Sequence, residues 1–190
     1  MKRIAILASG TGSNAENIAR QFEGDKHIAV DILLCDREAS PVLEKMKSFG
    51  IPTQIFPRAD WRSNPQPILE LLQNRNIDLI VLAGFTSFIP DCIVKAYERR
   101  IINLHPSLLP KFGGKGMWGM NVHRAVIEAG EKESGITIHY VSEEVDGGEI
   151  IAQFRCEVTP DDTPETLVAR IHALNISSIK AFESDSKFLS

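Results

Sequence analysis

Two polar residues near the middle of the chain have the side chains needed to stabilise negative charge on a carbonyl oxygen. Asn103 and His105 alternate with Leu104 at the end of an apolar run, and Pro106 follows them. In a strand this alternation places the amide and the imidazole on one face, where both can donate hydrogen bonds to a developing oxyanion. The alternative is a structural pair that bonds to loop backbone. The position at the end of a predicted strand favours catalysis.

An acidic turn at residues 143–148 offers a third group. Clustered carboxylates are usually solvated, but Asp146 precedes Gly147 and Gly148, which permit a sharp bend and close approach to a ligand. A carboxylate beside His105 would raise the imidazole pKa by favouring the imidazolium. We therefore expect a protonated His105 that can donate a proton at neutral pH.

A glycine loop, Ser9-Gly10-Thr11-Gly12-Ser13-Asn14-Ala15, lies between a predicted strand and a predicted helix. Free N–H groups at a helix start favour a phosphate, and glycines let the backbone approach it, so Gly12, Ser13 and Asn14 are candidate ligands. The alternative is a tight turn with Asn14 as the helix cap. The spacing also fits the dinucleotide fingerprint, with Asp36 about 20 residues further on, which leaves an NAD(P)-binding oxidoreductase open.

The remaining histidines have weaker claims to a role. His139 alternates onto one face of a predicted strand and is either a neighbour of the site or a core residue. Three others are expected at the surface: His27, His123 and His172. No H-E-x-x-H or comparable spacing is present, so we expect no metal site.

The elements that must position these groups alternate along the chain. Strands are expected at 3–8, 30–35, 53–56, 79–83, 101–104, 136–141 and 149–156, and helices at 15–23, 41–49, 68–74, 91–99, 122–129 and from 164 onward. The alternation predicts an α/β fold, a single-domain doubly wound and mostly parallel sheet with helices on both faces. Such sheets bind ligands at the carboxyl ends of strands, where all three motifs fall.

Composition limits the classes of protein that fit. The chain has 190 residues, 43% of them hydrophobic, and its 21 basic and 25 acidic residues give a net charge of −4. This excludes a disordered chain and predicts no nucleic-acid partner. No apolar stretch approaches the ~20 residues of a membrane span. The three scattered cysteines, Cys35, Cys92 and Cys156, indicate reduced thiols, and we expect a cytoplasmic protein.

Four motifs occur in the order seen in one enzyme family. They are the glycine loop, Val81-Leu82-Ala83-Gly84-Phe85, the stretch from Asn103 to Lys111, and Asp146-Gly147-Gly148. In these motifs the chain resembles the phosphoribosylglycinamide (GAR) formyltransferases, members of the folate-dependent formyltransferases with a Rossmann-like fold. The resemblance covers residues 3 to about 172.

The resemblance implies formyl transfer from 10-formyltetrahydrofolate to the amine of 5′-phosphoribosylglycinamide in purine biosynthesis, without a metal. It implies a phosphate-binding half, 1–100, and a catalytic and folate-binding half, 101–190. Asn103, His105 and Asp146 would be the catalytic residues, and residues 111–121 a loop that closes over the donor. The folate site would be lined by Thr86, Ser87, Phe88, Ile89, Asn103, Glu144, Val145 and Asp146, and the substrate phosphate held by Gly12, Ser13 and Asn14.

The sequence departs from the family pattern in three places. Thr86-Ser87 replaces a Met-Arg pair, the glycine-rich loop is longer and carries Trp118, and Asn175-Ile176 stands where a Glu-His pair helps to hold the ribose. A formyltransferase acting on an amino sugar nucleotide also fits the shared residues. The expected assembly is a monomer or a homodimer.

Overall fold

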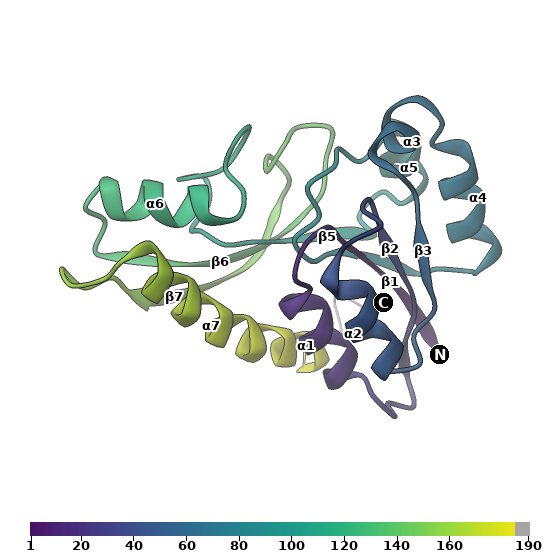
Figure 1. Cartoon of the computed structure of the whole chain (residues 1–190), viewed down its shortest axis with the longest axis horizontal. Helices are drawn as coiled ribbons and strands as arrows, with labels where there is room; N and C mark the ends of the chain where they lie inside the picture. The colour runs from purple at the N-terminus through teal and green to yellow at the C-terminus, as the bar shows by residue number, and fades with distance from the viewer. Residues whose placement is uncertain (185–190) are drawn as a thin grey trace. The chain divides into compact units, whose positions relative to one another are not determined.

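The computed structural model describes the backbone of residues 1–184 and the side chains of residues 1–174 (Figure 1). The described strands are β1 (Lys2–Ala8), β2 (Ile28–Cys35), β3 (Thr53–Ile55), β4 (Leu79–Leu82), β5 (Ile101–His105), β6 (Glu133–Tyr140) and β7 (Ile150–Glu157). The helices are α1 (Ser13–Gln21), α2 (Pro41–Ser48), α3 (Arg58–Ser63), α4 (Gln66–Asn74), α5 (Asp91–Ala96), α6 (Met120–Glu128) and α7 (Pro164–Ser184). None of the helices in this part of the chain is long and apolar enough to cross a membrane.

The chain divides into two compact units, Met1–Ile102 and Asn103–Ser190. The first unit is built on parallel strands in the order β3-β2-β1-β4. Consecutive residues of β1 and β4 are buried, so side chains on both faces of these strands are covered. This is the pattern of a parallel sheet, and it explains why both strands are continuous apolar runs.

The second unit contains an antiparallel pair, in which β6 runs from Glu133 opposite Glu157 of β7. Helices α6 and α7 pack against each other, and α7 also packs against both strands. The core between them is apolar and consists of Val126, Ile136, Ile138, Val158, Leu167 and Ile171. The expectation of an α/β fold with a mostly parallel sheet is confirmed, and the antiparallel pair is its exception.

The boundary between the units falls within strand β5, between Ile102 and Asn103, and the strand ends at His105. Its five residues are buried except Asn103, which is half-buried. Proline at 106 cannot donate a backbone hydrogen bond, so the strand ends there. The predicted catalytic pair therefore lies within the last three positions of a buried strand.

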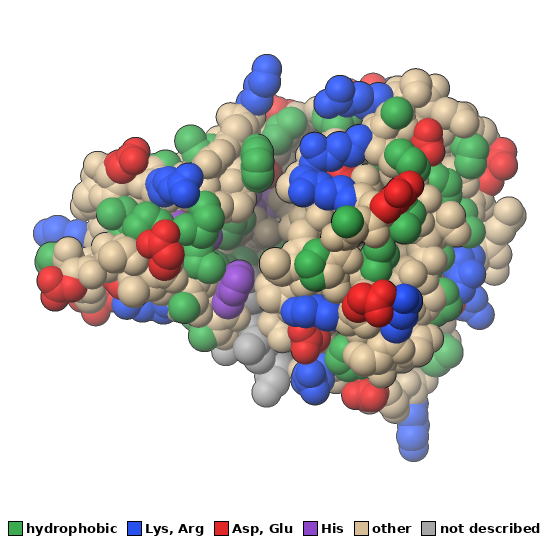
Figure 2. All heavy atoms as spheres, viewed as in Figure 1, with side chains coloured by type: hydrophobic (Ala, Val, Ile, Leu, Met, Phe, Trp, Pro, Cys, Tyr) green, Lys and Arg blue, Asp and Glu red, His purple; other side chains and the backbone are tan. Residues whose placement is uncertain are grey.

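One helix was not expected from the sequence. Residues 58–63 form α3, and the indole of Trp61 within it is buried, donates from Nε1 to the Phe56 carbonyl at 2.9 Å and packs edge-on against Phe85. A six-residue helix shows little periodicity, so its apolar anchor is visible only in three dimensions. Figure 2 shows basic and acidic side chains interspersed over the face in view, in line with the nearly balanced charge.

Candidate functional site

The second unit brings the three predicted catalytic residues together. The Asp146 carboxylate lies 3.5 Å from Nδ1 of His105, and its other oxygen is 3.4 Å from the Asn103 amide nitrogen. The same oxygen is 3.6 Å from Nε2 of His139. The amide, the two imidazoles and the carboxylate thus form one cluster at the end of β5.

The turn that holds Asp146 is shaped by its glycines. Asp146 itself has a positive φ of 55°, a conformation that Asp and Asn adopt more readily than most residues. A Cβ at Gly148 would lie only 1.7 Å from the carbonyl oxygen of Tyr140, so the backbone of the turn passes directly against β6. The Gly114 N–H donates to the carboxylate at 2.8 Å and fixes its orientation.

Two further hydrogen bonds assign the protons on the imidazoles. Nε2 of His105 lies 2.8 Å from the Phe112 carbonyl oxygen, and Nδ1 of His139 lies 2.9 Å from the Tyr140 carbonyl oxygen. A carbonyl only accepts, so each of these nitrogens carries a proton. The Asn103 amide nitrogen only donates, so Nε2 of His139, 3.1 Å away, accepts from it.

The electrostatics of the cluster differ from expectation at His105. Burial lowers the pKa of this imidazole, the negative charge of Asp146 raises it, and the net pKa is below the ordinary 6.5. The pKa of His105 is therefore shifted down, whereas the sequence led us to expect a raised pKa. The sequence shows that a carboxylate is near, but the extent of burial depends on the packed structure.

Asp146 stays ionised for reasons that the sequence did not reveal. Burial would raise the pKa of this carboxyl, but His139, His105 and the Gly114 N–H together hold it below its usual range. The Asn103 amide and the Gly114 N–H donate hydrogen bonds to this carboxylate, and such bonds favour its charged form.

The structure settles the location of two histidines, His139 and His123. His139 is buried beside Asp146 and belongs to the cluster, which decides between the two interpretations of this residue. His123 was expected at the surface but is buried in α6, and burial lowers its pKa to about 4. His27 and His172 are exposed, as expected.

The catalytic segment rests on a residue that sequence reasoning missed. The Thr137 hydroxyl donates to the Ser107 carbonyl at 2.7 Å and accepts from the Leu109 N–H at 3.0 Å. It also accepts from the Gln153 amide at 3.0 Å, and that amide donates to the Leu109 carbonyl at 2.9 Å. The sequence did contain a signal for this network, because Thr137 and Gln153 are polar residues within two largely apolar strands.

The glycine loop of the first unit has the predicted form. Gly12 precedes α1 with φ 75°, and a Cβ there would meet the Val42 side chain at 2.2 Å, so only glycine fits. Ser13 and Asn14 begin the helix, where the first N–H groups have no partner within it. The buried Oδ1 of Asn14 has no hydrogen-bond partner. Donors and one orphaned acceptor thus converge at a helix N-terminus.

Asp36 is occupied in a way that argues against a dinucleotide. Its side chain is fully covered and pairs with Arg58 at 2.9 Å, and the Ser87 hydroxyl donates to it at 2.6 Å. In a dinucleotide site this carboxylate would have to accept from a ribose hydroxyl. Instead it anchors the segment after β4 inside the first unit.

Thr86 lies in the same network. Its hydroxyl accepts from Arg58 at 2.5 Å and from Arg37 at 3.1 Å, and its N–H donates to Ser9 Oγ at 2.9 Å. The two residues that replace the Met-Arg pair therefore hold arginines and an aspartate together. The arginines that meet here are Arg37 and Arg58, which lie earlier in the chain than the Met-Arg pair of the family.

The other predicted folate-lining residues divide by exposure. Phe88 is 51% exposed and Val145 is 53% exposed, whereas Ile89 is buried in the core. Glu144 is exposed beside Val145, and its N–H donates to Ser142 Oγ at 3.3 Å. Two large apolar side chains are thus open to contact, and Ile89 supports the segment from inside.

The glycine-rich loop at 111–121 contacts the cluster through Gly114 and exposes Trp118 to 57%. The side chains of Asn175 and Ile176 lie outside the described residues. Within the described part, no three His, Cys, Asp or Glu side chains gather as a metal site requires.

Comparison with known proteins places these motifs in one family. The model described as Formyl transferase matches residues 2–181. A phosphoribosylglycinamide formyltransferase of Bacillus subtilis (strain 168) is 40% identical over 178 residues, which are 92% of this chain and 89% of the relative. The chloroplastic phosphoribosylglycinamide formyltransferase of Arabidopsis thaliana is 39% identical over 90% of this chain.

The chain spans 60% of the length of the Arabidopsis relative and of its Vigna unguiculata counterpart. The crystal structure of phosphoribosylglycinamide formyltransferase from Bacillus halodurans superposes with a TM-score of 0.85 at 34% identity, covering 100% of both chains. The matched residues include the glycine loop, the end of β5 and the Asp146 turn. The chain therefore belongs to the formyl transferase family.

Proposed function

We propose that the protein transfers a formyl group from 10-formyltetrahydrofolate to the amine of 5′-phosphoribosylglycinamide, a step of purine biosynthesis. The observation that carries the proposal is the contact of one ionised carboxylate, Asp146, with Asn103 and His105 at the end of β5. The phosphoribosylglycinamide formyltransferases among its relatives support the choice of substrate. The helix start at Ser13, whose first N–H groups have no partner within the helix, supports a phosphorylated substrate.

The reaction begins when the neutral amine attacks the formyl carbon. A C–N bond forms, the carbonyl electron pair moves to oxygen, and the nitrogen becomes an ammonium. The Asn103 amide stabilises the oxyanion by exchanging its long 3.4 Å contact with Asp146 for the new negative charge. Removing one such donor typically costs 10²–10³-fold in kcat.

Asp146 accepts the proton released by the ammonium. Nδ1 of His105 lies 3.5 Å from this carboxylate and can take the same proton from it, so that an imidazolium forms while the oxyanion is present. The proton is then passed to N10 of the folate, directly or through water, as the carbon–N10 bond breaks. The products are the formylated amine and tetrahydrofolate, with no covalent enzyme intermediate and no metal in any step.

The direct test is a formyl-transfer assay with glycinamide ribonucleotide and a 10-formyl folate analogue, run beside a His105→Ala variant. We expect turnover by the wild type and a loss of ~10²–10⁴-fold in the variant, as for removal of a general acid–base group. Transfer to an amino sugar nucleotide in place of glycinamide ribonucleotide would reassign the acceptor. Binding of NADH without binding of folate would overturn the proposal. A cytoplasmic location and a monomeric or homodimeric state are predictions made from the sequence.

A further inference from the structure

Two arginines, Arg37 and Arg58, meet beside the segment that follows β4 in the first unit, and we call them the arginine pair. Nη2 of Arg58 donates to Thr86 Oγ1 at 2.5 Å, and Nη2 of Arg37 donates to the same oxygen at 3.1 Å. Arg37 follows β2 and Arg58 begins α3, so separate segments bring the two charges together. The side chains are 46% and 50% exposed, so guanidinium N–H groups not used within the protein face solvent.

The arginine pair shares one carboxylate, that of Asp36. Its oxygens lie 2.9 Å from Nε of Arg58 and 3.7 Å from Nε of Arg37, and its side chain is fully covered. Burial would raise the pKa of Asp36, but hydrogen bonds from Ser87, Ser9 and Arg58 hold it below the usual range, so the carboxylate is negative at pH 7. Two cations and one anion leave one positive charge unbalanced, and the cations are the part that solvent reaches.

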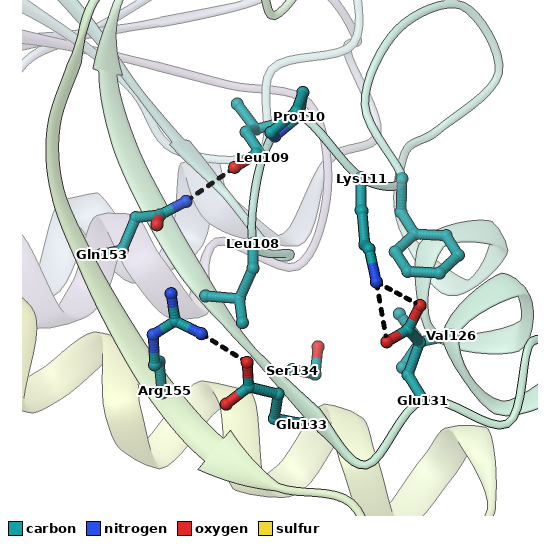
Figure 3. Close-up of a pocket in the computed structure, with 11 residues that line it drawn as sticks. Leu108, Leu109, Pro110, Lys111, Val126, Glu131, Glu133, Ser134, Gln153 and Arg155 are labelled. Atoms are coloured by element: carbon teal, nitrogen blue, oxygen red, sulfur yellow. Dashed lines mark hydrogen bonds and ion pairs between the residues drawn. The ribbon is translucent and has the colours of Figure 1, made fainter.

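The ion pairs around the cavity of the second unit are balanced differently. Lys111 pairs with Glu131 there, and Arg155 pairs with Glu133, as Figure 3 shows. Each of these cations has a carboxylate of its own, so the group carries no net charge that would favour an added anion. The arginine pair differs because its two guanidinium groups share a single carboxylate, which lies beneath them.

The groups around the arginine pair favour a carboxylate over a phosphate. The Thr86 oxygen already accepts two hydrogen bonds, so its hydroxyl can only donate to a ligand. The Thr86 N–H is taken by Ser9 Oγ at 2.9 Å and is not available for a phosphate. One unbalanced charge and two planar guanidinium groups match a singly charged, planar anion. Two residues further on, Phe88 is 51% exposed and offers contact to an apolar group beside that anion.

We propose that the arginine pair binds a carboxylate of the glutamate in the formyl-folate donor and selects donors that carry this group. The identity of the ligand rests on the proposed function. Of its two substrates, glycinamide ribonucleotide carries its charge on a phosphate, whereas the folate joins a carboxylate-bearing glutamate to an aromatic ring. Ser87, which stands in place of the family's arginine, is neutral and donates to Asp36. The positive charge at this segment therefore comes from Arg37 and Arg58.

The first test compares two donors that differ in the glutamate. One is 10-formyl-5,8-dideazafolate, and the other is the corresponding benzamide, which ends in a neutral amide. Arg37→Gln should raise KM ~10-fold for the first donor, because a hydrogen bond to a charged group is lost. It should leave KM for the benzamide and for glycinamide ribonucleotide unchanged. Arg37→Lys keeps the charge without the planar fork and should give an intermediate KM.

Two kinetic results would refute the assignment. An equal rise in KM for both donors would show that Arg37 does not act on the glutamate. A rise for glycinamide ribonucleotide in place of the folate would assign the arginine pair to the phosphate. Arg62→Gln, at an exposed position of α3 outside the arginine pair, is the matched control and should leave every KM unchanged.

A binding measurement separates this proposal from the proposed function. Calorimetry of the full chain with p-aminobenzoyl-L-glutamate requires no turnover, and about 19 non-hydrogen atoms at ordinary ligand efficiency predict a Kd of about 0.1 mM. Arg37→Gln should raise this Kd ~10-fold, and Arg62→Gln should not change it. NMR spectra without ligand check that each variant is folded.

The same titration shows which of the two proposals fails. Saturable, Arg37-dependent binding in a protein that transfers no formyl group would refute the proposed function and leave the carboxylate site in place. No saturable binding by 20-fold above the expected Kd, or an equal Kd in the wild type and Arg37→Gln, would overturn the carboxylate site.

Discussion

At the scale of single residues, Asp146 is the point on which the cluster depends. Its two oxygens face two imidazoles, an amide and the Gly114 N–H, all within 3.6 Å. These contacts hold its pKa below the usual range despite its burial, and its charge in turn opposes the fall of the His105 pKa. A group that organises its neighbours in this way affects both the geometry and the protonation of the site.

Replacing Asp146 with Asn should lower kcat by ~10²–10⁴-fold, because the amide cannot accept the amine proton. Asn tolerates the positive φ of this position, so the fold should be kept. The measurement is steady-state kinetics beside thermal unfolding. Asp161→Asn, at an exposed site of the same unit, is the matched control and should turn over normally. Near-normal turnover of the Asp146 variant would remove this carboxylate from the mechanism.

The protonation of His105 gives a second prediction at this scale. The pKa of the wild-type imidazole should lie below 6.5, and Asp146→Asn should lower it further, because the charge that favours the imidazolium is lost. Titration of the ring signals by NMR measures both values. A pKa that rises in the variant would show that Asp146 does not act on His105 as its 3.5 Å separation indicates.

At the scale of elements, the turn before α1 depends on the absence of a side chain at Gly12. An alanine there would adopt a left-handed conformation, at a cost of ~1–2 kcal/mol, and would also collide with Val42. Gly24 has nearly the same φ, 74° against 75°, but open space around its Cβ position. Gly12→Ala should therefore lower the free energy of unfolding by more than Gly24→Ala in chemical denaturation. Equal losses would mean that α2 yields to the new methyl group without cost.

The start of α1 predicts a kinetic effect on one substrate. Ser13→Ala should raise KM for glycinamide ribonucleotide by ~10-fold, the effect of one hydrogen bond to a charged group, and leave KM for the formyl folate unchanged. Ser63→Ala, on the exposed end of α3, is the comparison variant. If KM changed equally for both substrates, the loop would not be a phosphate site.

The sequence predicted elements well where packing follows the local pattern. The buried runs of β1 and β4 and the strand-end position of Asn103 and His105 could be predicted because parallel strands are apolar on both faces. The helix around Trp61, the burial of His123 and the lowered pKa of His105 could not be predicted. Each of these depends on contacts between residues far apart in the chain, which periodicity does not reveal.

At the scale of the whole molecule, buried histidines make stability depend on pH. The pKa of His123 is about 4 in the folded chain, below the ordinary 6.5, so the unfolded chain binds its proton first as the pH falls. The contribution of neutral His123 to the free energy of unfolding is complete above pH 6.5. It is lost between pH 6.5 and 4, by up to about 3 kcal/mol.

Denaturant unfolding at a series of pH values tests this expectation. His123→Leu should flatten the decline between pH 6.5 and 4, whereas His27→Leu, at an exposed position, should leave its slope unchanged. A decline as steep in the His123 variant as in the wild type would assign the acid sensitivity to other groups.

The Thr137 hydroxyl has a consequence for protein engineering. It joins Ser107, Leu109 and Gln153 through three hydrogen bonds, although it touches none of the atoms assigned to the chemistry. Grafting the Asn103–His105 strand and the Asp146 turn onto a new scaffold would thus copy the reactive groups without the Thr137 hydrogen bonds that hold the segment after His105 in place. A designer would have to carry Thr137 and Gln153 along, since an isosteric valine at 137 would strand three polar partners in the interior.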